Sequence, residues 1–175
     1  MHSVVKTWLA FGLAFFLTGC GQETVQSKPE IHITGSTMGT YYSIKVADSA
    51  VQDAARLQAE VDVLLERVND QMSTYRPDSE LSRFNQHKSN TPVVVSRDTA
   101  RVVTEAIHIG RESRGALDVT VGPLVNLWGF GPDARPTKVP SDELIAQTRQ
   151  KTGLGNLHVI TSADADTLQK DIPDL

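Results

Sequence analysis

The chain has 175 residues, of which 39% are hydrophobic and 22% are charged, as in an ordinary globular protein. Its 17 Lys and Arg against 21 Asp and Glu give a net charge of −4, and the cations are not clustered. Nucleic acid is therefore excluded as an expected partner, because phosphate binding needs clustered positive charge. The length favours a single domain.

The first twenty residues have the arrangement of a secretory signal. Lys6 is followed by the apolar run WLAFGLAFFL and then by small residues before Cys20, the only cysteine. The run is shorter than the roughly 20 apolar residues that a membrane-spanning helix needs. The sequence LTGC resembles the lipobox of bacterial lipoproteins, which implies removal of residues 1–19 and lipidation of the Cys20 thiol. An uncleaved anchor with an incidental thiol is the alternative.

A polar segment without periodicity follows and predicts a flexible tether over residues 20–30. Alternating apolar and polar residues then predict a strand at Thr40–Val46 with one buried face, after a short strand at Ile31–Thr34. Between them lies GSTMGT, Gly35–Thr40. A turn needs no thioether, so Met38 at its tip either packs on the core or serves another purpose.

A long helix is predicted from a cap at Asp48 or Ser49 to about Met72, because apolar residues recur every three or four positions. Its core-facing stripe comprises Ala54, Leu57, Val61, Leu64, Leu65, Val68 and Met72. The segment 73–77 must leave the helix, because the residue before a proline avoids helical backbone angles. Tyr75 in this segment is either a core-edge residue or an aromatic platform for a ring-shaped ligand.

Serine caps and hydrophobic periodicity predict the remaining elements. The expected helices are Glu80–Asn85 behind Asp78-Ser79, Arg97–Ser113 behind Ser96, and Ser141 to about Lys151. Gly115 is expected at the C′ position of the second of these helices. The expected strands are Pro92–Val95, Leu157–Thr161 and Thr167–Ile172. Residues 31–175 thus predict one α+β domain, with a mixed or antiparallel sheet and packed helices.

The stretch GALDVTVGPLVNLWGFG, from Gly115 to Gly131, does not have the composition of an ordinary core segment. Glycines, Pro123 and Trp128 are interleaved with Val and Leu, which favours backbone that comes close to a flat partner. An irregular buried loop is the alternative. The chain has no metal-ligand spacing of histidines, no GxSxG and no Walker A sequence, so catalytic residues are not assigned.

Three ordered motifs resemble those of the FAD:protein FMN transferase (ApbE) family. They are GSTMGT at 35–40, STYRPDSELSRFN at 73–85 and GALDVTVGPLVNLWGFG at 115–131. The similarity covers essentially the whole chain after its signal, whereas family members continue well past this point. The resemblance therefore implies that residues 31–175 are the N-terminal part of a single FMN transferase domain, from a truncated gene or an incomplete record.

The resemblance implies transfer of FMN from FAD to a Thr or Ser hydroxyl of a partner flavoprotein, with release of AMP and a requirement for Mg²⁺. Met38 would contact the flavin nucleotide and Tyr75 would stack on a ring. Ala116, Leu117 and Asp118 would lie along the FAD; Leu117 stands where relatives carry Met, a change of similar volume. No residue matches the family's Mg²⁺ ligands, which are expected in the missing C-terminal half.

The acceptors implied by the family are flavoprotein subunits of respiratory ion pumps. The lipoprotein signal implies the periplasmic side of a bacterial membrane; the family favours the inner one, although Gly21 after Cys20 leaves that choice open. Without the metal ligands, we expect this chain alone neither to transfer FMN nor to bind FAD tightly. The alternatives are a non-catalytic flavin-binding lipoprotein, an inactive fragment and a lipid-anchored structural domain.

Overall fold

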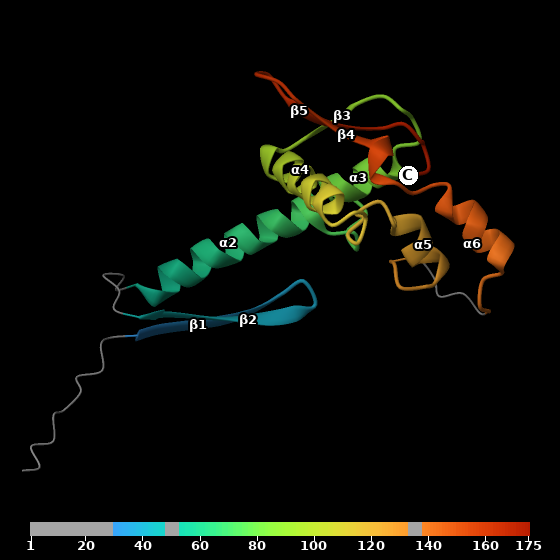
Figure 1. Ribbon diagram of the computed structural model, residues 1–175. Coiled ribbons are helices and arrows are strands. Elements are labelled where there is room, and N and C mark those ends of the chain that lie inside the picture. Colours follow the sequence, from blue (N-terminus) through green and yellow to red (C-terminus); the bar gives the residue numbers. More distant parts are fainter. Residues whose placement is uncertain (1–29, 48–52, 133–137) are drawn as a thin grey trace, which may run out of the picture.

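The computed structural model describes residues 30–47, 53–132 and 138–175 (Figure 1). The predicted signal, the lipidation site Cys20 and the proposed caps Asp48 and Ser49 lie outside these ranges, as does the predicted tether except for its last residue. The elements in chain order are β1 (Glu30–Thr37), β2 (Thr40–Ala47), α2 (Ala54–Met72), α3 (Glu80–Gln86), β3 (Val93–Val95), α4 (Arg97–Glu112), α5 (Gly122–Leu127), α6 (Asp142–Arg149), the 3-10 helix η1 (Leu154–Asn156), β4 (Leu157–Thr161) and β5 (Asp166–Lys170).

Strands β1 and β2 form an antiparallel hairpin with Thr37 opposite Thr40. The two residues of its turn, Met38 and Gly39, both have positive φ, at 50° and 75°. Such a turn follows the right-handed twist of the paired strands, which is why it is favoured in tight hairpins. The predicted alternation of β2 is confirmed, since every second residue, including Tyr42, is partly buried.

Helix α2 lies alongside the hairpin and joins it to the rest of the fold (Figure 1). Asp53 caps it by accepting a hydrogen bond from the Arg56 amide at 2.9 Å. The predicted stripe is only loosely covered: none of the helix residues is fully buried, and Ala54 and Leu64 are exposed. A two-stranded hairpin is too narrow to cover a helix of this length, so the predicted core-facing stripe is wrong at these two positions.

The hydrophobic core lies where α3 and α4 pack on a second antiparallel sheet, of strand order β3-β5-β4. Its buried side chains are Phe84, Val95, Ala100, Ile107, Leu157 and Leu168. Burial of each large side chain contributes about 1.5–3 kcal/mol. Strand β5 begins at Asp166 and ends at Lys170, one residue earlier and two residues earlier than predicted. The Asp171 amide still donates to the Asn156 carbonyl at 2.9 Å, in register with the β4–β5 pairs.

Helices α3, α4 and α6 begin at the predicted caps. The hydroxyls of Ser79, Ser96 and Ser141 each accept a hydrogen bond from the amide three residues further on. The end of α4 differs from the prediction by one position. The Gly115 amide donates to Gly110 at 2.8 Å and the Arg114 amide to Arg111 at 3.0 Å, so Arg114 takes the C′ position with φ 56° and Gly115 follows it.

Residues 122–127 of the glycine-rich stretch form the short helix α5, which the sequence reading did not predict. Pro123 in its first turn suits a helix start, since its missing N–H would have no partner there. The irregular-loop hypothesis is wrong for this part. Helix α5 packs on α6 (Figure 1). Within the ranges that the structure describes, no helix is both long and apolar enough to span a membrane.

Candidate functional site

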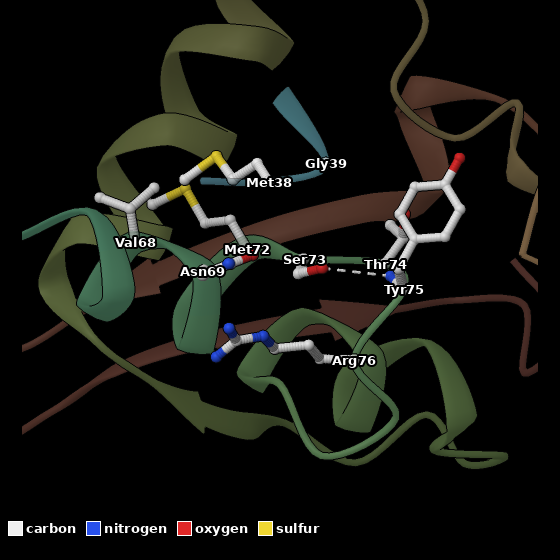
Figure 2. A pocket seen from close by; sticks show the side chains of 9 residues that line it. All are labelled: Met38, Gly39, Val68, Asn69, Met72, Ser73, Thr74, Tyr75 and Arg76. Carbon is white, nitrogen blue, oxygen red and sulfur yellow. Dashed lines mark hydrogen bonds between the residues drawn. The ribbon is translucent and has the colours of Figure 1, made fainter. Parts of the chain in front are cut away.

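A pocket of about 760 Å³ opens between the hairpin turn and the C-terminal end of α2 (Figure 2). Its size is that of a small-molecule site. The lining residues are Met38, Gly39, Val68, Asn69, Met72, Ser73, Thr74, Tyr75 and Arg76. The fold thus brings together the first two sequence motifs, which lie far apart in the chain.

One side of the pocket is apolar and carries two thioethers. Figure 2 shows Met38 from the turn and Met72 from α2 reaching toward the same region, with Val68 beside them. Met38 is 50% exposed, so the hypothesis that it packs into the core is wrong. Thioethers are polarisable and adapt to flat or irregular partners, so this side suits the face of an aromatic ring.

Tyr75 stands at the other side of the pocket, and 74% of this residue is exposed. The core-edge hypothesis for this residue is therefore wrong. Its amide donates to the Ser73 hydroxyl at 3.2 Å, which shapes the backbone of the turn while leaving the ring accessible. An exposed aromatic ring on an ordered turn can stack on a planar ligand.

The serines of the second motif stabilise this turn by hydrogen bonds. The Ser73 carbonyl accepts hydrogen bonds from the hydroxyls of Ser79, at 2.5 Å, and Ser82, at 3.1 Å. Both donors are buried, and Ser79 also caps α3. The sequence reading recognised the cap but missed the second bond. Ser73, Ser79 and Ser82 were visible in the motif, but only the fold shows that they converge on one carbonyl.

Ala116, Leu117 and Asp118 do not line this pocket. They follow the end of α4, where Ala116 and Leu117 are exposed. One Asp118 oxygen accepts from the Thr120 amide at 2.8 Å and from the Thr120 hydroxyl at 2.6 Å. The structure therefore brings together Met38 and Tyr75 and places residues 116–118 elsewhere.

Asp118 organises the chain around it. The Thr120 hydroxyl that it holds is buried and also accepts from the Gly153 amide at 2.6 Å, which ties the segment to the loop before η1. The same segment approaches α4 closely: a methyl group at Gly110 would lie 2.8 Å from the Leu117 carbonyl oxygen. The sequence reading did not predict that Gly110 is needed for this close approach.

The pocket lining contains no carboxylate, and Arg76 is its only charged residue. Among the residues that the structure describes, no three His, Cys, Asp or Glu side chains gather as a possible metal site. The described residues thus do not fit the Mg²⁺ that the resemblance implies, and we derive no step through that metal. The arrangement suits recognition of a neutral planar group between thioethers and an aromatic ring.

The fold and the pocket define an α+β domain with a small-molecule site, and comparisons with known proteins identify the family. The sequence profile of the ApbE family matches residues 38–175. The chain is 51% identical over 173 residues to the FAD:protein FMN transferase of Vibrio cholerae, covering 98% of this chain and 49% of that protein. For the FAD:protein FMN transferase of Haemophilus influenzae, identity is 42% over 176 residues, covering 99% and 50%.

Solved structures agree. The flavin transferase ApbE of Vibrio cholerae matches with a TM-score of 0.77 and 56% identity, covering 84% of this chain and 47% of that one. The apo flavinyl transferase ApbE of Pseudomonas stutzeri matches with a TM-score of 0.76 and 34% identity, covering 84% and 48%. The chain therefore belongs to the ApbE family, which confirms the predicted family and α+β fold. It spans about half the length of the curated relatives that it matches.

Proposed function

We propose that this chain supplies one wall of the FAD site of an FMN transferase. The transferase moves FMN from FAD to a Thr or Ser hydroxyl of a partner flavoprotein and releases AMP. The observation that carries the proposal is that Met38 and Tyr75, from separate motifs, line one pocket of about 760 Å³. The family membership and the names of the relatives, FAD:protein FMN transferase, support the same activity.

The proposed reaction is a phosphoryl transfer. The acceptor hydroxyl oxygen attacks the phosphorus on the FMN side of the FAD pyrophosphate, the bond to the bridging oxygen breaks, and AMP leaves with the bonding electrons. The hydroxyl proton passes to a base that we do not assign. Such reactions depend mainly on positioning and on stabilisation of phosphate charge, so a fixed ring at one end of FAD helps to align the phosphorus.

The wall that this chain supplies has both apolar and polar parts. The Met38 and Met72 thioethers offer contact to a ring face, and Tyr75 offers a second aromatic surface. Asn69, Ser73 and Thr74 place hydrogen-bonding groups beside them. Small-molecule sites commonly combine an apolar lining with a few polar groups that set orientation.

Further features of the proposal rest on the sequence motifs. Ala116, Leu117 and Asp118 would extend along the FAD beyond the described pocket. Mg²⁺ dependence follows the family resemblance, with the ligands outside the described residues. Lipidation at Cys20 would hold the protein at the periplasmic side of a bacterial membrane, with the inner membrane favoured by the family. Flavoprotein subunits of respiratory ion pumps would be the acceptors there.

FAD titration of the expressed chain tests whether it supplies this wall of the FAD site. We expect weak binding, with a Kd on the order of 10⁻⁵ M or higher, that Met38→Ala and Tyr75→Ala each weaken further by roughly three- to tenfold. His32→Ala is a matched control, because His32 lies on the hairpin outside the pocket lining. Equal binding by all four proteins would contradict the proposed site.

A transfer assay tests the activity. It follows AMP release and covalent flavin on a peptide that carries an acceptor Thr, with FAD and Mg²⁺ present. We expect no transfer by the 175-residue chain alone, since it spans only half the length of its relatives. Robust transfer would contradict the view that the reaction needs residues beyond those matched here.

A further inference from the structure

Arg76 is adjacent to Tyr75 in the pocket lining, but its side chain points away from the ring (Figure 2). Its guanidinium reaches back to α2 and donates to both oxygens of Glu66, at 2.7 and 3.0 Å. The nitrogen of the shorter bond also donates to Asp70 at 2.5 Å. A planar guanidinium that engages a carboxylate with two parallel bonds fixes orientation as well as distance.

Glu66 and Asp70 lie one turn apart on α2, on the segment that also carries Val68, Asn69 and Met72 of the pocket lining. Two carboxylates at this spacing repel each other unless a cation lies between them. Arg76 provides that cation. The side of the pocket formed by α2 and the turn that bears Tyr75 are therefore connected by one ionic cluster, Arg76–Glu66–Asp70.

This cluster complements the serine contacts on the other side of Tyr75. The Ser73 carbonyl is held by two serine hydroxyls, and the Ser79 amide donates to the Arg76 carbonyl at 3.2 Å. Thr74 and Tyr75 thus lie between two anchored positions. Without the guanidinium contacts, the segment after Tyr75 would keep its bonds toward α3, in which Gln86 and Arg83 donate to the Pro77 and Asp78 carbonyls. It would lose the side-chain bonds that tie it to α2.

The cluster is too exposed to be explained by stability of the whole fold. The Arg76 side chain is 34% exposed and the two acids are 60% and 65% exposed. Ion pairs of this kind contribute little to global stability. Their geometric effect is local, on the short turn that they attach to the helix. Hydrogen bonding from Arg76 lowers the pKa of Glu66, which agrees with a contact that persists at neutral pH.

We propose that Arg76 is a positioning residue: through Glu66 and Asp70 it fixes the turn so that Tyr75 faces a ring bound over Met38 and Met72. This inference rests on the proposed FAD site. Arg76 itself would not touch the ligand. Loss of the Arg76 contacts would make the turn more mobile. Ligand binding would then have to order Tyr75, which lowers the affinity.

The test compares variants of the full chain by FAD titration, thermal unfolding and amide hydrogen exchange over residues 73–77 without flavin. Arg76→Gln and Glu66→Gln break the cluster, and Arg76→Lys keeps the charge without the paired bonds. The exchanged pair Glu66→Arg with Arg76→Glu restores it. Arg56→Gln is the matched control, because Arg56 makes an exposed 2.8 Å ion pair with Glu60 on the same helix, away from the pocket.

We expect Arg76→Gln to weaken FAD binding by roughly three- to tenfold, because this is the effect of losing one aromatic contact. We also expect faster amide hydrogen exchange in the turn. Unfolding should shift no more than in Arg56→Gln. Arg76→Lys should be intermediate, and the exchanged pair should recover binding.

Three results would overturn the inference. If Tyr75→Ala weakens binding while Arg76→Gln does not, the positioning role is wrong and the proposed FAD site stands. If the unaltered chain does not bind FAD at all, the proposed site fails and the positioning role fails with it. Weaker binding by Arg76→Gln without faster exchange in the turn would also contradict the role, because the turn would then be ordered without the cluster.

Discussion

Met38 combines a demanding backbone position with an exposed thioether. Its φ of 50° lies in the left-handed region, where side chains other than Gly, Asn and Asp are unfavourable by about 1 kcal/mol or more. Its side chain is half exposed and gains little from burial. A costly residue at an exposed turn is expected where function, rather than stability, selects the side chain.

Replacing Met38 should therefore separate stability from binding. Met38→Asn gives the Asn-Gly pair that this turn type favours, and we expect it to stabilise the chain by roughly 0.5–1 kcal/mol while weakening FAD binding. Met38→Ala removes the same thioether without the favourable turn residue and should weaken binding without stabilising. Urea unfolding and FAD titration check both. Binding by Met38→Asn equal to that of the unaltered chain would show that the thioether is dispensable.

Glu66 should make the stability of the Arg76–Glu66–Asp70 cluster depend on pH. Hydrogen bonding from Arg76 lowers the pKa of Glu66 in the folded chain. The stabilisation is therefore present above the ordinary pKa of a glutamate and is lost as pH falls through the lowered value. Amide hydrogen exchange over residues 73–77 should be faster in Glu66→Gln than in the unaltered chain at neutral pH, and the difference should vanish in acid. A difference that is constant across this range would contradict the ionic contact.

At the scale of elements, α4 and the segment after it are held together by close backbone approach. A methyl group at Gly110 would meet the Leu117 carbonyl oxygen at 2.8 Å and a Leu154 methyl carbon at 2.2 Å. The segment 116–118 depends on this contact and on the bonds from Asp118 to Thr120. A side chain added at Gly110 should therefore displace both η1 and the predicted FAD-lining segment 116–118.

Gly110→Ala tests this coupling. We expect destabilisation of about 1–3 kcal/mol, because the carbonyl is main chain and cannot move independently. Gly122→Ala is the matched control, since no atom lies within 4 Å of a methyl group there, and it should be neutral or stabilising by up to about 1 kcal/mol. Urea unfolding measures both. Equal stability of the two variants would mean that the approach of Leu117 to α4 is not tight.

The elements that could be predicted from sequence are those fixed by local chemistry. Ser79, Ser96 and Ser141 cap helices through bonds to residues three positions away, so their signal is visible in a short window. Helix α5 was missed because glycine and proline outweighed a short apolar run. Arg114 was missed at the C′ position because Gly115, beside it, is the residue that usually occupies it.

The candidate site could be predicted only in part. Met38 and Tyr75 were proposed from motif resemblance, and their meeting in one pocket depends on how the hairpin lies along α2, which no local pattern specifies. The bonds from Arg76 to Glu66 depend in the same way on the direction of the turn after the helix. Tertiary placement of exposed polar residues leaves no periodic signal in the sequence.

At the scale of the molecule, the described residues leave many large apolar side chains exposed. Among the described residues, exposed large hydrophobic side chains outnumber the buried ones of the core. Several are well exposed aromatics, including Tyr41 at 85%, Phe130 at 79% and Trp128 at 43%. The chain spans about half the length of the curated relatives that it matches, and exposed apolar surface of this kind is typical of an interaction site.

We therefore expect the 175-residue chain by itself to associate in solution, because exposed apolar side chains gain free energy when they are removed from water. Sedimentation across a concentration series should show species larger than the monomer, and a dye that binds apolar surface should fluoresce with the folded chain. Phe130→Ser with Trp128→Ser should reduce both signals, whereas Thr34→Ser on the exposed side of β1 should not. If the chain is monomeric at all concentrations and the dye does not fluoresce with it, the exposed side chains are too dispersed to form an interaction surface.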